Sequence, residues 1–173
     1  QLVTGRYDDA AASAREAARD ASLREEAVVL EAEAHFARGR LEDVDRLLGG
    51  LPETNDRASL FLARAAERRG RMDDARRFYR RIIEGYNAER ITARDAAGLA
   101  YVGSAAYALG VVRDANTAFQ ESVAADAQRV ETQLEWAQLF LEKYDAGHAE
   151  ECVQDALRVN PEHPVAHTLY ARI

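Results

Sequence analysis

The sequence predicts an all-α protein built from antiparallel helix pairs that stack on one another. Three observations support this prediction: a recurring six-residue motif, a spacing near 34 residues between its copies, and helical periodicity in the segments between them. Each copy of the motif begins with a glycine: GRYDDA at Gly5, GRLEDV at Gly39, GRMDDA at Gly70 and GVVRDA at Gly110. Those glycines lie 34, 31 and 40 residues apart. A period of this length is typical of arrays in which each repeat is one supersecondary unit.

Aligning the repeats on these turns brings similar residues into columns. The column five positions after the first residue of each turn and the column seven positions before it hold mostly small residues. The column nine positions after it holds mostly larger residues. Small side chains let two helices approach closely, and bulky ones fill the space towards the next pair. We therefore expect all three columns to be buried: Ala10, Val44, Ala75, Ala115 and Ala149; Ala14, Leu48, Tyr79, Phe119 and Val153; Ala32, Ala63, Gly103 and Ala137.

The helix ends carry local signals. Each turn glycine is predicted to end the first helix of a pair with a positive φ, which costs little without a Cβ. In the enlarged fourth unit, Thr92 followed by Asp95 reads as a capping box, which predicts a helix from Thr92 to Leu109, about 27 Å long. This enlargement is either an ordinary insertion or a bend or protruding helix end that shapes a partner site. Pro164 suits the first turn of the last helix.

The chain resembles the tetratricopeptide repeat family, most closely in LEWAQLFLEKYDAGHAEECVQDALRVNPEHP. The residues that carry the resemblance are Trp136, Ala137, Phe140, Ala149, Ala156 and Pro161. Tyr144 replaces the turn glycine of the last unit. The resemblance implies a right-handed superhelical solenoid of about five repeats, a single domain over residues 1–173. Its units are expected at approximately 1–24, 25–54, 55–90, 91–127 and 128–162, with a final helix at 163–173.

Composition excludes several classes of function. The net charge of −7 argues against nucleic-acid binding, which needs a basic surface. No run approaches the roughly 18 apolar residues of a membrane helix, so we expect no membrane contact by this segment. One cysteine, Cys152, excludes an internal disulfide. No signal peptide is visible, and because the chain starts at Gln1 rather than Met we expect a fragment of a larger protein. The chain resembles the repeat arrays of large bacterial proteins, and the sequence does not fix its compartment, although the cytoplasm is favoured.

No enzymatic signature is present, so we expect no catalysis and no cofactor. The sequence lacks a glycine-rich phosphate loop, a nucleophile elbow and an HExxH motif. His148 and Cys152 share a helical face, but two ligands do not make a metal site. Capping and packing explain His163 and His167 better than metal binding, and His35 stands in a core column.

Aromatic residues at Trp136, Tyr79, Phe78 and Phe119 recur at packing positions of the repeat. We therefore assign them to the core rather than to base stacking. The pentatricopeptide family, which reads RNA, has a similar helix pair, but the acidic charge and the quoted columns argue against it.

The resemblance implies that the first helix of each pair lines a peptide-binding groove. Arg57, Arg64 and Arg68 share a helix face whatever the family, and guanidinium groups favour carboxylates. The hypothesis is a groove for an acidic segment of another protein; the alternative is a solvated charged face. The groove positions are Glu26, Glu33, Arg57, Arg64, Arg68, Tyr101, Ser104, Tyr107, Glu131, Glu135 and Gln138.

Three kinds of function remain open. The first is a protein–protein interaction scaffold, which includes self-association through exposed terminal helices. The second is a docking or regulatory segment of a larger enzyme such as a bacterial peptidase, and the third, a free-standing enzyme, has no motif in its favour. The clamp by which some family members hold acidic chaperone tails is absent as a set, because Glu33, Leu60, Tyr101 and Glu135 occupy its positions.

Overall fold

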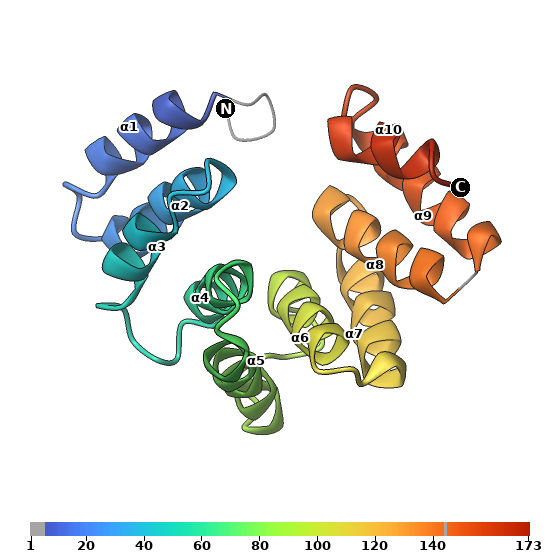
Figure 1. The fold of residues 1–173 in the computed structure, drawn as a ribbon, viewed down its shortest axis with the longest axis horizontal. Coiled ribbons are helices and arrows are strands. Elements are labelled where there is room, and N and C mark those ends of the chain that lie inside the picture. The colour runs from blue at the N-terminus through green and yellow to red at the C-terminus, as the bar shows by residue number, and fades with distance from the viewer. Residues whose placement is uncertain (1–5, 144) are drawn as a thin grey trace. The chain divides into compact units, whose positions relative to one another are not determined.

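Helices joined by turns and short connections make up the part of the chain that the structure describes. A computed structural model describes residues 6–143 and 145–173; the predicted turns at Gly5 and Tyr144 lie outside these residues. Over the described ranges the secondary structure consists of ten helices and no strand (Figure 1). The helices are α1 (Tyr7–Ala17), α2 (Arg24–Ala37), α3 (Leu41–Leu48), α4 (Asp56–Arg68), α5 (Met72–Asn87), α6 (Ala96–Ala108), α7 (Val112–Ala125), α8 (Val130–Glu142), α9 (Ala146–Val159) and α10 (Pro164–Tyr170).

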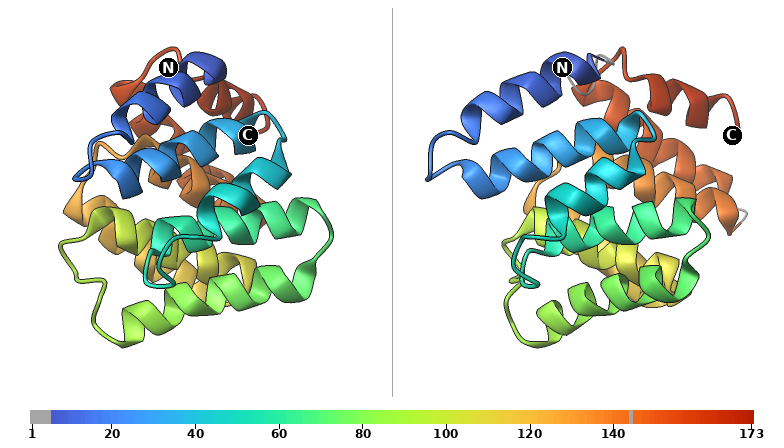
Figure 2. Two further views of the ribbon diagram at one scale, coloured as in Figure 1. Left: turned by 90° about the vertical axis from the view of Figure 1, so that its left-hand side faces the viewer. Right: turned by 60° about the vertical axis from the view of Figure 1, so that its left-hand side comes forward.

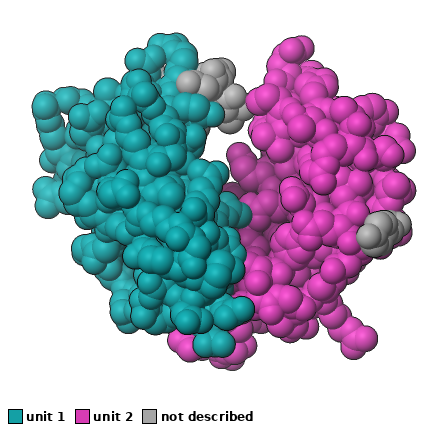
Figure 3. All heavy atoms as spheres, viewed as in Figure 1, with its two compact units in different colours: residues 1–82 teal, residues 83–173 magenta. Residues whose placement is uncertain are grey.

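The chain forms two compact units, residues 1–82 and 83–173, which are coloured separately in Figure 3. The boundary falls inside α5. In unit 1, α2 packs against α1, α3 and α4, and the views of Figure 2 show α2 beneath α1. In unit 2, α6 packs against α7, α7 against α8 and α8 against α9, while α10 packs on α8 and α9. Each unit is therefore a succession of helices that pack on their neighbours in the sequence.

The predicted glycine turns are confirmed. Gly39, Gly70 and Gly110 have φ values of 72°, 71° and 81°. At Gly70 the Arg71 N–H donates to the Ala66 carbonyl at 2.9 Å, and the glycine N–H donates to the Glu67 carbonyl at 2.8 Å. This pair of hydrogen bonds is a Schellman motif, which satisfies the last carbonyls of the helix and needs a left-handed residue.

The packing columns are buried almost throughout, as predicted. Ala32, Ala63 and Ala137 have no exposed surface, and Gly103 is buried in the same column. Ala10 is the exception, since it is half-buried on α1. The larger residues of the second alignment column pack beside these small ones, and Leu48, Tyr79, Phe119 and Val153 are at most 3% exposed.

Gly103 and Phe119 are matched to each other. A Cβ on Gly103 would lie 2.5 Å from Cδ1 and 2.6 Å from Cε1 of the Phe119 ring. Phe119 is fully buried in the core between α6 and α7. In the fourth repeat, glycine occupies the position that is alanine in the other repeats of this column, because the neighbouring helix α7 carries Phe119.

The predicted start of the helix at Thr92 is wrong. The helix α6 begins at Ala96, and the Asp95 carboxylate caps it by accepting the Gly98 N–H at 2.9 Å. The Thr92 carbonyl instead accepts the Asp95 N–H in the preceding turn. The helix therefore has 13 residues and is about 20 Å long. The extra residues of the enlarged unit lie in the 16-residue α5 and in the connection that follows, where Glu89 has a φ of 58°.

The last helix begins as predicted. Pro164 occupies its first turn, and the buried His163 caps it, because its Nδ1 accepts the Ala166 N–H at 3.4 Å. No helix within the described ranges combines the length and the apolar character that a membrane crossing requires.

Candidate binding surfaces

The five groove positions predicted in unit 1 lie on α2 and α4. Arg57 of α4 donates from Nη2 to Oε2 of Glu33 on α2 at 2.6 Å, and both side chains are largely buried. Glu26 lies exposed in the first turn of α2. A ligand carboxylate would therefore share the Arg57 guanidinium with Glu33, which is feasible because a guanidinium carries five N–H donors.

Two aromatic rings that the sequence analysis missed support the other arginines. The Arg68 guanidinium carbon lies 3.8 Å from the centroid of the Phe36 ring, and its Nη1 donates to the Phe36 carbonyl at 2.9 Å. The Arg64 guanidinium lies 5.9 Å from the centroid of Phe61. Phe36 and Phe61 meet edge to face at 5.5 Å. Arg57, Arg64, Arg68, Phe36 and Phe61 together form what we call the arginine face.

The six remaining groove positions lie on α6 and α8 of unit 2. The structure brings Ser104 and Glu135 together, because the buried Ser104 hydroxyl contacts the Glu135 carboxylate. Tyr101 and Gln138 are half-buried, and Glu131 is exposed. The predicted groove positions of unit 2 carry carboxylates and hydroxyls and no guanidinium, whereas those of unit 1 include three arginines.

The Tyr107 hydroxyl is buried and has no hydrogen-bond partner of good geometry among the described residues. Burial raises the pKa of Tyr107 well above its usual range, and the nearby Glu142 carboxylate raises it further. Tyr107 therefore stays neutral and contributes its ring to the core between α6 and α7, next to Phe119.

His35 is buried, as its column predicted, but it is not an isolated core histidine. Its Nε2 lies 3.5 Å from Oε1 of the buried Glu31, and its Nδ1 lies 3.7 Å from Oδ2 of Asp43. Arg15 approaches the same Glu31 oxygen at 3.2 Å. These partners compensate the cost of burying the Glu31 charge. The cluster therefore ties α1 and α3 to α2.

His148 and Cys152 do not share a site. The exposed His148 ring stacks on Phe140 at 5.1 Å and its Nδ1 pairs with Asp145 at 2.8 Å. Cys152 is 5% exposed, and burial, with a smaller effect of Glu151, raises the pKa of its thiol to about 12. Among the described residues, His, Cys, Asp and Glu form no group of three that could hold a metal ion.

The aromatic assignments hold with one correction. Tyr79 and Phe119 are core residues, and the half-buried Trp136 packs on Phe140 and donates from Nε1 to Asn116 at 2.9 Å. Phe78 is not a core residue: it is half-exposed and lines a pocket in unit 1.

Helix hairpins that end in left-handed glycines and join through small-residue columns define an α-helical repeat protein. The family model described as tetratricopeptide repeat matches residues 1–43 and 53–90. Together with the repeat columns and the helix order, this match shows that the chain belongs to the tetratricopeptide repeat family. No curated protein matches the sequence.

Two solved structures show the same fold at low sequence identity. A chain of the crystal structure of the APC/C hetero-tetramer Cut9-Hcn1 is 17% identical, with a TM-score of 0.60 over 84% of this chain and 29% of that one. YrrB, described as a TPR protein with an unusual peptide-binding site, is 14% identical, with a TM-score of 0.54 over 97% of this chain and 85% of YrrB. The chain thus spans less than a third of the Cut9-Hcn1 chain that it matches.

Proposed function

We propose that this repeat module binds an acidic, extended segment of a partner protein on the arginine face of unit 1. The observation that carries the proposal is the alignment of Arg57, Arg64 and Arg68 along one side of α4, with Phe36 and Phe61 beneath two of the guanidiniums. Tetratricopeptide repeats are in general noncatalytic interaction scaffolds. YrrB, a neighbour of the same fold, is described as a TPR protein with an unusual peptide-binding site.

The contacts support this role in physical terms. A guanidinium over a ring gains cation–π attraction within about 6 Å and loses side-chain freedom before a ligand arrives. A cation–π contact uses the face of the guanidinium, so its in-plane N–H groups can still donate to a carboxylate. The predicted groove positions of unit 2 include the carboxylates of Glu131 and Glu135, which would repel an acidic segment. We therefore assign the acidic segment to unit 1 only.

The test uses charge reversal with a matched control on another helix. We expect Arg57→Glu with Arg64→Glu to abolish binding of a fluorescein-labelled peptide of alternating Glu and Ser in an anisotropy titration. The same double reversal at Arg76 and Arg80, exposed residues of α5, should leave the affinity nearly unchanged. Equal losses in both double variants would reduce the proposal to a general charge effect, and unchanged affinity in the first would refute it.

Self-association is a second candidate, favoured by the exposed apolar residues near the end of unit 2. Val159, Val165 and Tyr170 are 45%, 50% and 47% exposed on α9 and α10. Burying these exposed apolar side chains against a second copy of the chain would remove them from water. Light scattering should show a mass that rises with concentration, and Val165→Lys with Tyr170→Lys should abolish that rise; a constant monomer mass contradicts this candidate.

A further inference from the structure

Unit 1 contains a pocket of about 360 Å³ on a different side of α4 from the arginine face. From α4, the pocket is lined by Ala58, Ser59 and Leu62. At about 100° per residue, these positions point away from Arg57 and Arg64. The volume lies in the range of protein sites for small ligands and side chains. It is therefore a surface that the proposed function does not use.

The pocket exists because α3 is short. This helix has 8 residues, whereas α7 and α9, the second helices of later pairs, have 14 each. The missing residues would extend α3 by about 9 Å. The chain instead leaves the helix after Leu48 through Gly49 and Gly50, and the connection that leads to α4 lines the pocket. The 31-residue spacing between Gly39 and Gly70 is the trace of this shortening in the sequence.

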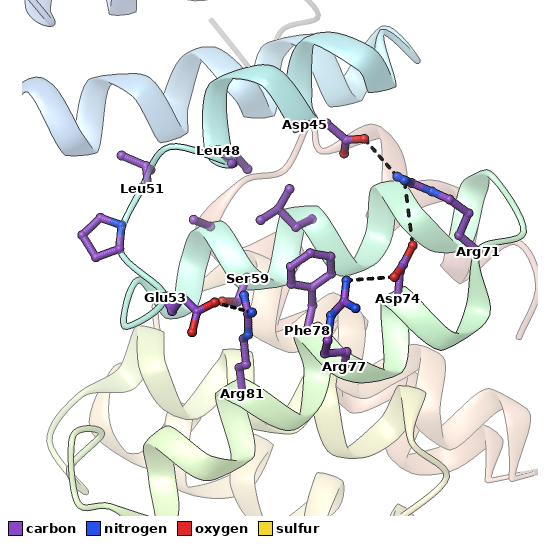
Figure 4. Close-up of a pocket in the computed structure, with 14 residues that line it drawn as sticks. Asp45, Leu48, Leu51, Glu53, Ser59, Arg71, Asp74, Arg77, Phe78 and Arg81 are labelled. Atoms are coloured by element: carbon purple, nitrogen blue, oxygen red, sulfur yellow. Dashed lines mark hydrogen bonds and ion pairs between the residues drawn. The ribbon is translucent and has the colours of Figure 1, made fainter.

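The floor of the pocket is apolar. Leu48 and Ala58 are buried there, while Leu51, Leu62 and Phe78 keep part of their surface exposed. In Figure 4 the Phe78 ring stands in the middle of the lining residues, between the Asp74–Arg77 pair and the Glu53–Arg81 pair. Such a floor favours an apolar side chain, because burying it removes apolar surface from water.

The rim carries guanidiniums paired with carboxylates, of which Glu53 is more exposed than Asp74. Arg77 donates to Asp74 at 2.8 Å, and Arg81 pairs with Glu53, whose side chain is 76% exposed. Both guanidiniums also lie beside the Phe78 ring, at 5.4 and 5.2 Å from its centroid. Exposed ion pairs contribute little to stability, so a ligand carboxylate can replace Glu53 on Arg81 and leave Glu53 in water.

Arg71 adds a third guanidinium at the other end of the rim. It donates to Asp45 at 2.9 Å and lies 3.9 Å from Asp74. Asp74 is therefore shared between Arg71 and Arg77, and neither guanidinium has all of its N–H groups satisfied by it. The rim thus holds three arginines and three carboxylates around an apolar floor. A ligand that is apolar at its centre and anionic beside it fits by taking the place of the exposed Glu53 carboxylate on Arg81.

We propose that this pocket binds an acidic segment of a partner protein that inserts one apolar side chain onto Phe78 and places a neighbouring carboxylate on Arg77 and Arg81. The site is separate from the arginine face, so either surface can fail its test without the other. A bidentate guanidinium–carboxylate contact would orient the segment, and the apolar side chain would anchor it.

The test measures binding of the full chain to an array of eight-residue peptides. Each peptide carries one Leu, Phe or Trp and two Asp residues at varied spacing. The best peptide is then labelled with fluorescein and titrated by anisotropy. Arg77→Gln with Arg81→Gln should weaken its binding at least about tenfold, and so should Phe78→Ala. Arg76→Gln with Arg80→Gln is the matched control, since it makes the same changes at the same spacing on α5 outside the pocket.

The expected result is a loss confined to the pocket variants, with the control pair and Arg57→Glu/Arg64→Glu close to the unsubstituted chain. The proposal is overturned if no array peptide binds, if the control pair loses as much, or if only the Arg57/Arg64 variant loses binding. The proposal is also overturned if N-acetylphenylalanine displaces the peptide and binds as tightly as the peptide does, because the pocket would then be a site for a free aromatic acid. Circular dichroism checks that each variant is folded. If the double variant unfolds, the peptide affinity of Arg81→Gln is compared with that of its control Arg80→Gln, and a loss in Arg81→Gln alone supports the proposal.

Discussion

Gly103→Ala is the substitution whose outcome depends most directly on the packing between α6 and α7. The new Cβ would lie 2.5 Å from the Phe119 ring, closer than side-chain carbons approach one another, and Phe119 is fully buried. The ring has no free space to enter, so the two helices must separate or Phe119 must leave its rotamer. Overpacking of this kind costs roughly 1–3 kcal/mol.

A helix-interior alanine is more favourable than glycine by about 1 kcal/mol, which offsets part of that cost. We therefore expect Gly103→Ala to lower the free energy of unfolding by about 1 kcal/mol, the difference between an overlap of about 2 kcal/mol and the propensity gain. With Phe119→Leu the ring is absent, and the same alanine should then stabilise by up to about 1 kcal/mol. The sign of its effect should change with the background.

Urea unfolding of the four chains of this double-mutant cycle measures the coupling, which we expect to be about 2 kcal/mol. Gly147→Ala is the matched control: it lies in α9, and the nearest atom to its Cβ is 3.9 Å away. It should be neutral or stabilising. If Gly103→Ala stabilises the chain equally with Phe119 and with leucine at that position, the close-packing explanation of the small column is wrong.

Three further predictions concern helix ends and the buried thiol. Asp95→Ala should cost about 1 kcal/mol of stability by urea unfolding, whereas Thr92→Ala should have almost no effect; the reverse order would restore the helix start at Thr92. Gly70→Ala should cost about 1 kcal/mol because of its left-handed φ, and a neutral result would contradict that conformation. Because burial raises the pKa of Cys152 to about 12, stability should fall as the pH rises above the ordinary thiol pKa of about 8.5 and continue to fall towards 12. Cys152→Ala should remove this part of the pH dependence, and identical slopes would show that the thiol ionises freely.

The repeat columns and the turn glycines were predictable because they depend on contacts that every unit makes. Ala63 and Ala137 are buried for the same reason, close helix approach, and the alignment of units shows it directly. The start of α6 was not predictable in the same way. Thr92 and Asp95 are both suitable caps three residues apart, and the sequence holds no local feature that chooses between them.

The candidate binding surfaces were only partly predictable. Helical spacing places Arg57, Arg64 and Arg68 on one face, but the ring contacts with Phe36 and Phe61 depend on how α2 lies against α4. The pocket beside Phe78 depends on the length of α3. The shortened spacing signals a missing segment, but not whether a helix or a loop has lost it.

The proposed function is tested most directly by nuclear magnetic resonance of the arginine side chains in the presence of an acidic peptide. The account predicts that the Nε–H signals of Arg57, Arg64 and Arg68 shift together on titration, with one dissociation constant. Signals that stay unchanged, or shifts confined to arginines elsewhere in the chain, would contradict the assignment of the arginine face as the binding surface.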